Sequence, residues 1–109
     1  MDWVISKDVF EHISYEEIDK WISDLSKISK NAFVIVPLGE NGRYIVPAYE
    51  LDATHIIREN LEWWKKKLEE NGFHVKSAEY KVPFIKENWN KWEYGNVFFV
   101  AETQVKNLF

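Results

Sequence analysis

The sequence predicts an α/β domain in which parallel strands carry flanking helices and an antiparallel pair of strands ends the sheet. Two observations support this prediction. Residues 14–28 have the apolar spacing of an amphipathic helix. Residues 33–37 form a continuously apolar run, which is typical of a strand covered on both faces. Strand and helix patterns alternate without a repeat or linker, so we expect one domain over residues 1–109.

The first two elements follow from local chemistry. Residues 2–6 are rich in β-forming side chains and predict a strand, which a link over residues 7–13 follows. Ser14 and Glu17 have the spacing of a capping box, in which each side chain accepts from an amide of the first turn, so we expect the helix to begin at Ser14. The apolar face of this helix consists of Ile18, Trp21, Ile22, Leu25 and Ile28.

A second predicted strand and a long loop occupy the middle of the chain. The strand covers residues 33–37 and ends where Pro37 and Gly39 interrupt the apolar run. The loop then extends over about residues 38–58, and loops of this length in compact domains are often functional.

The last part of the chain predicts one more helix and two strands. The helix covers about residues 59–71, and Gly72 stands where a left-handed C-cap belongs. Residues 73–82 and 96–103 predict strands. No helix separates these two strands, so we expect them to be antiparallel.

Composition excludes several classes of protein. The net charge of −4 disfavours non-specific nucleic-acid binding, which needs a positive field. The absence of cysteine excludes a disulfide scaffold and thiolate metal sites. No apolar run approaches the ~20 residues that span a bilayer, and the N-terminus does not resemble a signal peptide. We therefore expect a cytoplasmic protein without a membrane partner.

Several segments, taken in order, resemble the class I S-adenosylmethionine-dependent methyltransferases. Residues 2–13 resemble the fourth strand and following turn of that family, with a Glu-His pair at Glu11 and His12. Residues 33–37 resemble the fifth strand, and Asp-Ala-Thr-His at 52–55 resembles the loop after it. The predicted second helix, which runs into Asn71-Gly72-Phe73, is similar to the helix and the Gly-Phe pair before the family's sixth strand. The last two predicted strands resemble the antiparallel pair that closes such sheets. The resemblance implies a three-layer, Rossmann-like sheet.

The sequence also departs from the family. Its only glycines are at positions 39, 42, 72 and 95, so it has no G-x-G turn of the kind that lets backbone approach a cofactor. We expect the chain to match the second half of such an enzyme, from strand four to strand seven, without its first half. S-adenosylmethionine would then bind only when that half is supplied. We also expect the open edge of the first strand to be covered by a second copy or a separate chain.

Candidate catalytic and substrate residues gather where the first two strands end. Glu11 and His12 are the candidate catalytic pair, and Asp8, His55 and Tyr49 are candidate substrate-binding residues. If residues 8–12 were helical, Asp8 would share a face with Glu11 and His12. Three roles stay open for this group: loop anchoring by hydrogen bonds, proton transfer at the acceptor, and binding of a divalent cation. Small-RNA 2′-O-methyltransferases hold magnesium with a similar set.

The resemblance implies that backbone groups at Ser6 and Lys7 approach the methionine portion of the cofactor, although a plain strand end is the alternative. The function implied is methyl transfer by a domain that is catalytically incomplete alone. The alternative is a binding or interaction domain without activity, with residues 83–95 as its contact surface.

Overall fold

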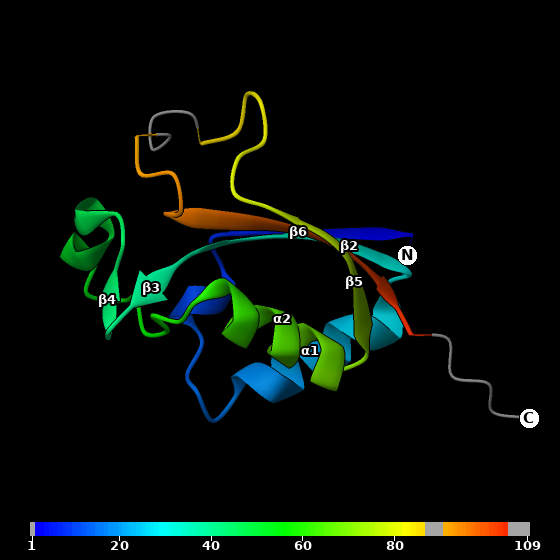
Figure 1. Ribbon diagram of the computed structural model, residues 1–109. Helices are drawn as coiled ribbons and strands as arrows, with labels where there is room; N and C mark the ends of the chain where they lie inside the picture. The colour runs from blue at the N-terminus through cyan, green and yellow to red at the C-terminus, as the bar shows by residue number, and fades with distance from the viewer. Residues whose placement is uncertain (1, 87–90, 105–109) are drawn as a thin grey trace, which may run out of the picture.

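The computed structural model describes residues 2–86 and 91–104. A four-stranded sheet in the order β1-β2-β6-β5 forms the centre, and a two-stranded hairpin of β3 and β4 lies at one end (Figure 1). The elements in chain order are β1 (Trp3–Lys7), η1 (Phe10–His12), α1 (Ile18–Ile28), β2 (Asn31–Pro37), β3 (Gly39–Glu40), β4 (Arg43–Tyr44), η2 (Pro47–Leu51), α2 (Leu61–Glu70), β5 (Phe73–Glu79) and β6 (Asn96–Thr103).

The strand directions agree with the predicted α/β fold. β1 and β2 are parallel and are joined through α1, as expected for a strand–helix–strand crossover. β6 is antiparallel to both β2 and β5, which confirms the predicted antiparallel pair at the C-terminal end. The sheet is therefore mixed, and β1 stands at its edge.

The helix α1 begins later than the capping box predicts. Residues 15–17 form turns, and the Ser14 hydroxyl donates to the Glu17 carboxylate over 3.2 Å instead of accepting from an amide. The apolar face is also narrower than predicted, because Trp21 and Ile28 are about half exposed. Ile18 and Ile22 are fully buried and form the centre of the stripe.

The later boundaries are close to the predicted ones. Asn60 caps α2 by accepting from the Trp63 amide over 2.9 Å, so the helix begins at Leu61 rather than near residue 59. Gly72 has a φ of +103°, which confirms its left-handed position at the helix end. β5 ends at Glu79 and is three residues shorter than predicted.

The long loop contains local structure that its composition does not reveal. Gly39 and Glu40 pair with Arg43 and Tyr44 in the β3–β4 hairpin. A side chain at Gly39 would place its Cβ 2.6 Å from the backbone of Arg58, so only glycine allows this close approach. The hairpin is thereby held beside the segment that leads into α2.

The main core lies between the sheet and the helices. α1 and α2 both cover the same face of the sheet (Figure 1). The two described helices therefore form a single layer on that face. Alternate residues of β2 and β6 point into this core, which also holds Trp64 and Leu68 of α2. On the opposite face, Phe33 stacks on Phe98 with ring centroids 6.4 Å apart.

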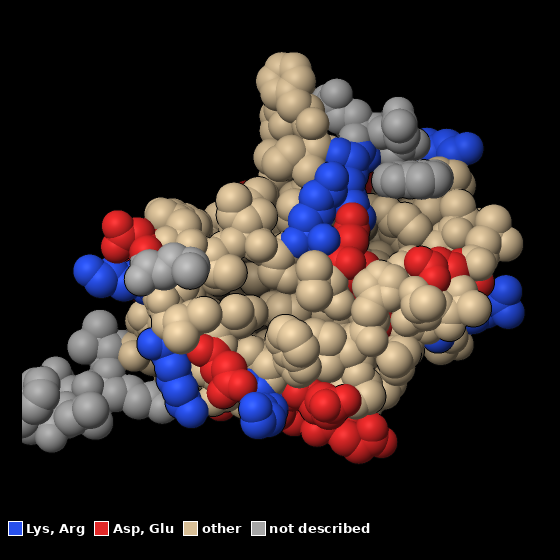
Figure 2. All heavy atoms as spheres, turned by 180° about the vertical axis from the view of Figure 1, so that it is seen from behind, with Lys and Arg blue, Asp and Glu red and all other residues tan. Residues whose placement is uncertain are grey.

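The edge strand β1 exposes large apolar side chains. Ile5 is 70% exposed and Trp3 is 50% exposed, and β1 pairs with β2 on one side only. The view from behind, the side on which β1 lies, shows a broad uncharged band between charged groups above and a row of charged side chains below (Figure 2). No helix in the described part of the chain is long and apolar enough to cross a membrane.

Candidate functional site

The turn after β1 and the segment before α2 are joined at the carboxyl ends of the parallel strands. The carbonyl oxygen of Glu11 accepts from the amides of Ile56 and Ile57 over 2.7 and 3.0 Å. This double hydrogen bond fixes the short helix η1 against residues 52–57. It brings together the Glu-His pair and the Asp-Ala-Thr-His segment, as the sequence predicts for side chains at one sheet edge.

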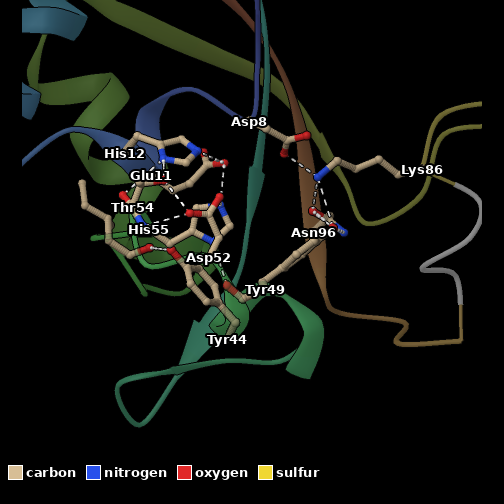
Figure 3. Close-up of polar contacts among 11 residues, drawn as sticks. Asp8, Glu11, His12, Tyr44, Tyr49, Asp52, Thr54, His55, Lys86 and Asn96 are labelled. Atoms are coloured by element: carbon tan, nitrogen blue, oxygen red, sulfur yellow. Dashed lines mark hydrogen bonds and ion pairs between the residues drawn. The ribbon is translucent and has the colours of Figure 1, made fainter.

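Asp8 does not share a face with Glu11 and His12. Its φ is +57°, so the backbone makes a left-handed turn after β1, and the helical turn begins only at Phe10. The Asp8 carboxylate points away from the Glu-His pair and contacts the Lys86 ammonium (Figure 3). The helical arrangement considered for residues 8–12 is therefore wrong.

Glu11 is a buried carboxylate without a hydrogen-bond donor among the described residues. Its side chain is 1% exposed, and neither oxygen has a hydrogen-bond partner. Two imidazole nitrogens lie near its carboxylate, His12 Nε2 at 3.8 Å and His55 Nε2 at 4.0 Å, and both distances are beyond hydrogen-bond range. Burial raises the pKa of Glu11 from 4.5 to about 7, with a smaller contribution from the nearby Asp8.

Both imidazoles are held by their Nδ1 atoms. His55 Nδ1 lies 2.8 Å from the carbonyl oxygen of Tyr49, and His12 Nδ1 lies 3.2 Å from that of Thr54. Because a carbonyl oxygen only accepts, each Nδ1 donates its proton, and in the neutral ring Nε2 then carries a lone pair. The two Nε2 atoms therefore present lone pairs beside the Glu11 carboxylate (Figure 3).

Asp52 and Thr54 support this arrangement. The Thr54 amide and hydroxyl both donate to Asp52 Oδ1, over 2.8 and 2.6 Å, and these hydrogen bonds lower the pKa of Asp52. Thr54 Oγ1 also lies 2.9 Å from His12 Nδ1, and Asp52 Oδ2 lies 3.5 Å from His55 Nε2. The turn thus positions both imidazoles and adds negative charge next to them.

Glu11, His12 and His55 form a group with the donor atoms of a cation site. One ligand atom from each lies within 4.8 Å of the other two. A carboxylate oxygen and two imidazole nitrogens are ligands that suit divalent transition metals. The group has three acceptors and no donor, so a proton or a cation is what would complete it chemically.

A second polar cluster lies beside the first and contains Lys86, which the sequence did not indicate. The Lys86 side chain is 7% exposed, and its ammonium contacts Asp8, the Asn96 side-chain oxygen at 2.8 Å and the Tyr49 hydroxyl at 3.2 Å (Figure 3). Lys86 belongs to a segment without regular structure, and no spacing in the sequence connects it to Asp8.

The remaining predicted site residues are Tyr49, which lies between the two clusters, and Ser6 and Lys7, which lie at the end of β1. Tyr49 contacts both clusters, because its carbonyl oxygen accepts from His55 while its hydroxyl joins Lys86 and Asn96. Ser6 is 5% exposed, and its hydroxyl has no hydrogen-bond partner among the described residues. Lys7 is exposed at the end of β1. Part of the predicted contact surface at 83–95, including Trp89, lies outside the described residues.

Comparison with known proteins identifies the fold. No protein-family model matches the sequence, and no curated protein matches it. Among solved structures, the chain is similar to one from the complex of the Haloferax volcanii Trm112 methyltransferase activator with a protein assigned as a methyltransferase. The TM-score is 0.70 at 13% identity, covering 100% of this chain and 56% of that one.

Two further structures have the same fold. A SAM-dependent methyltransferase from Archaeoglobus fulgidus is similar with a TM-score of 0.63 and 18% identity, over 94% of this chain and 59% of that one. The small RNA methyltransferase HEN1 is similar with a TM-score of 0.66 and 10% identity, over 99% of this chain and 14% of that one. The chain therefore has the α/β fold of SAM-dependent methyltransferases, and it spans less than two thirds of each of these neighbours.

Proposed function

We propose that this chain is the C-terminal half of a methyltransferase domain descended from the S-adenosylmethionine-dependent enzymes and is catalytically incomplete alone. The observation that carries the proposal is the one-sided pairing of β1, whose Ile5 and Trp3 remain exposed beside a polar site at the strand ends. The missing part would pair along β1 and contribute the cofactor-binding turn.

The residues of this chain do not by themselves fit S-adenosylmethionine. The sequence has no G-x-G turn, and β1 offers the cofactor only the backbone at Ser6 and Lys7. In the completed enzyme, the backbone at Ser6 and Lys7 would face the cofactor. Glu11 and His12 would face the acceptor as a proton-transfer pair, with Asp8, His55 and Tyr49 holding the substrate.

When the completing half is absent, we propose that a second copy of the chain covers the β1 edge. In light scattering after size exclusion, the wild-type chain should dimerise as its concentration rises. Ile5→Lys should weaken that dimer at least tenfold, because it places a charge on the apolar edge. Trp21→Lys is the control, since Trp21 is similarly exposed but lies on α1. A clean monomer at high concentration would contradict this part of the proposal.

A divalent-cation site is a second candidate function, and the unpartnered carboxylate of Glu11 between two Nε2 atoms favours it. In that case Glu11, His12 and His55 would hold the cation, which would supply a fixed positive charge near the acceptor. Millimolar Mn²⁺ or Zn²⁺ should raise the melting temperature by mass action. His55→Gln should abolish the rise, whereas His74→Gln, an exposed histidine on β5, should preserve it. An unchanged melting temperature in the wild type would exclude the site.

The alternative of a binding domain without activity rests on the same fold and the same open edge. It differs in requiring no completing half with a glycine-rich turn. A partner chain that carries such a turn and restores methyl transfer would favour the enzyme, and a partner without one would favour the binding domain.

A further inference from the structure

A groove separate from the Glu-His-His group lies between the β3–β4 hairpin, the start of α2 and two tyrosines of the β5–β6 connection. Its volume is about 790 Å³, within the range of about 300–1,000 Å³ that is common for small-molecule sites. The hairpin lies beyond the N-terminal end of α2, at one end of the sheet (Figure 1). None of Glu11, His12 and His55 lines the groove.

The charged lining of the groove is negative. Three carboxylates line it, those of Glu40, Glu59 and Glu62, against the single cation Arg58. Arg58 is already paired, because its Nε donates to the Glu50 carboxylate over 2.9 Å. Neither Glu40 nor Glu62 forms an ion pair with the described residues. Arg43 lies opposite Glu40 in the β3–β4 hairpin but does not line the groove. The lining therefore carries more carboxylates than cations, and a cation entering the groove would be attracted to it.

Aromatic rings form the second part of the lining. Tyr80 and Tyr94 meet edge to face with ring centroids 4.8 Å apart, and 38% and 53% of their respective surfaces are exposed. Tyr15 also lines the groove, and its hydroxyl donates to Glu59 over 2.8 Å. The faces of tyrosine rings attract ammonium and guanidinium groups, so these rings add to the preference for a cation.

The rest of the lining is apolar. Leu38, Ile45, Ile56 and Leu61 contribute to it. Carboxylates, aromatic rings and aliphatic side chains in one groove match a molecule that has a positive end and a hydrocarbon chain. We propose that this groove is a binding site for a small organic cation of the alkylammonium class. The site goes beyond the proposed methyl transfer, because it needs neither S-adenosylmethionine nor a second half of the fold.

The proposal can be tested with three probes of the same length that differ in charge. Pentylammonium, 1-pentanol and pentanoate are titrated separately into the ¹⁵N-labelled chain, and amide shifts are followed by NMR. Pentylammonium should saturate shifts at residues 39–45 and 58–62, and 1-pentanol should bind at least tenfold more weakly. Pentanoate should not shift these residues.

Two variants sharpen the test. The double variant Glu40→Gln with Glu62→Gln should weaken pentylammonium binding at least tenfold, and the readout needs no activity. Glu70→Gln at the other end of α2 removes an exposed charge outside the groove and should change the affinity less than twofold. Equal binding of pentylammonium and pentanol, or an equal loss in Glu70→Gln, would overturn the proposal. So would the absence of shifts at millimolar pentylammonium.

Discussion

The two polar clusters at the strand ends differ in how far their buried charges are satisfied. The Lys86 ammonium has three oxygen partners, from Asp8, Asn96 and Tyr49. The Glu11 carboxylate, which is even more buried, has no hydrogen-bond partner among the described residues, and both neighbouring imidazoles direct Nε2 toward it. The Lys86 cluster is complete within the chain, whereas the Glu11 cluster is not.

This difference separates a structural role from a functional one. A satisfied buried network fixes one arrangement of the chain, and here it ties the segment carrying Lys86 to the end of β1. An unsatisfied buried charge costs stability and persists where a ligand, a proton or a substrate uses it. We therefore expect changes at Glu11 to alter stability in the opposite direction from changes at Lys86.

The largest expected effect comes from Glu11. Its pKa is about 7 in the folded chain and 4.5 ordinarily, so the folded state binds the proton more tightly than the unfolded state. Stability should therefore fall as the pH rises through that interval, by up to about 3 kcal/mol. Glu11→Gln removes this loss and should be more stable than the wild type at about pH 8. Urea unfolding in a metal chelator at several pH values measures the effect.

The control is to measure the wild type and Glu11→Gln over the same pH range, because both keep His12, His55 and Asp52. At about pH 4 the wild-type Glu11 is protonated and the two free energies of unfolding should be similar. Parallel pH profiles for wild type and Glu11→Gln would show that Glu11 is not a strained buried acid.

A smaller effect of opposite sign is expected at Lys86. Lys86→Met keeps much of the aliphatic volume but removes the ammonium that donates to the buried Asn96 oxygen and pairs with the Asp8 carboxylate. The loss of stability should be about 2 kcal/mol, measured by urea unfolding at neutral pH. Lys81→Met is the matched control, because Lys81 is an exposed lysine of the same connection and should change stability by less than about 0.5 kcal/mol. Equal losses in the two variants would mean that Lys86 is not tied into the strand ends.

The sequence predicted the sheet well because its strands are marked by composition and its crossover by one amphipathic helix. It predicted the meeting of Glu11, His12 and His55, since strand ends of one direction share an edge. It did not predict the turn at Asp8, where a non-glycine residue takes a φ of +57°, and it therefore placed Asp8 with the wrong neighbours.

Lys86 and the groove beside α2 could not be predicted for a different reason. Both depend on contacts between segments far apart in the chain, such as Asp8 with Lys86 and Tyr15 with Glu59. The sequence around these residues has no periodic pattern or motif that links one partner to the other, so nothing local indicates the contact. The capping box at Ser14 is a local motif that does not form in the structure. The Ser14 hydroxyl donates to the Glu17 carboxylate instead, and residues 15–17 form turns.

Calorimetry can test the proposal that this chain is half of a methyltransferase domain and does not hold the cofactor alone. The purified chain is titrated with S-adenosylmethionine and with S-adenosylhomocysteine, at a concentration where its oligomeric state is known. We expect no binding of either compound up to millimolar concentration, because no G-x-G turn is present in the chain. Micromolar binding by the chain alone would contradict the proposal.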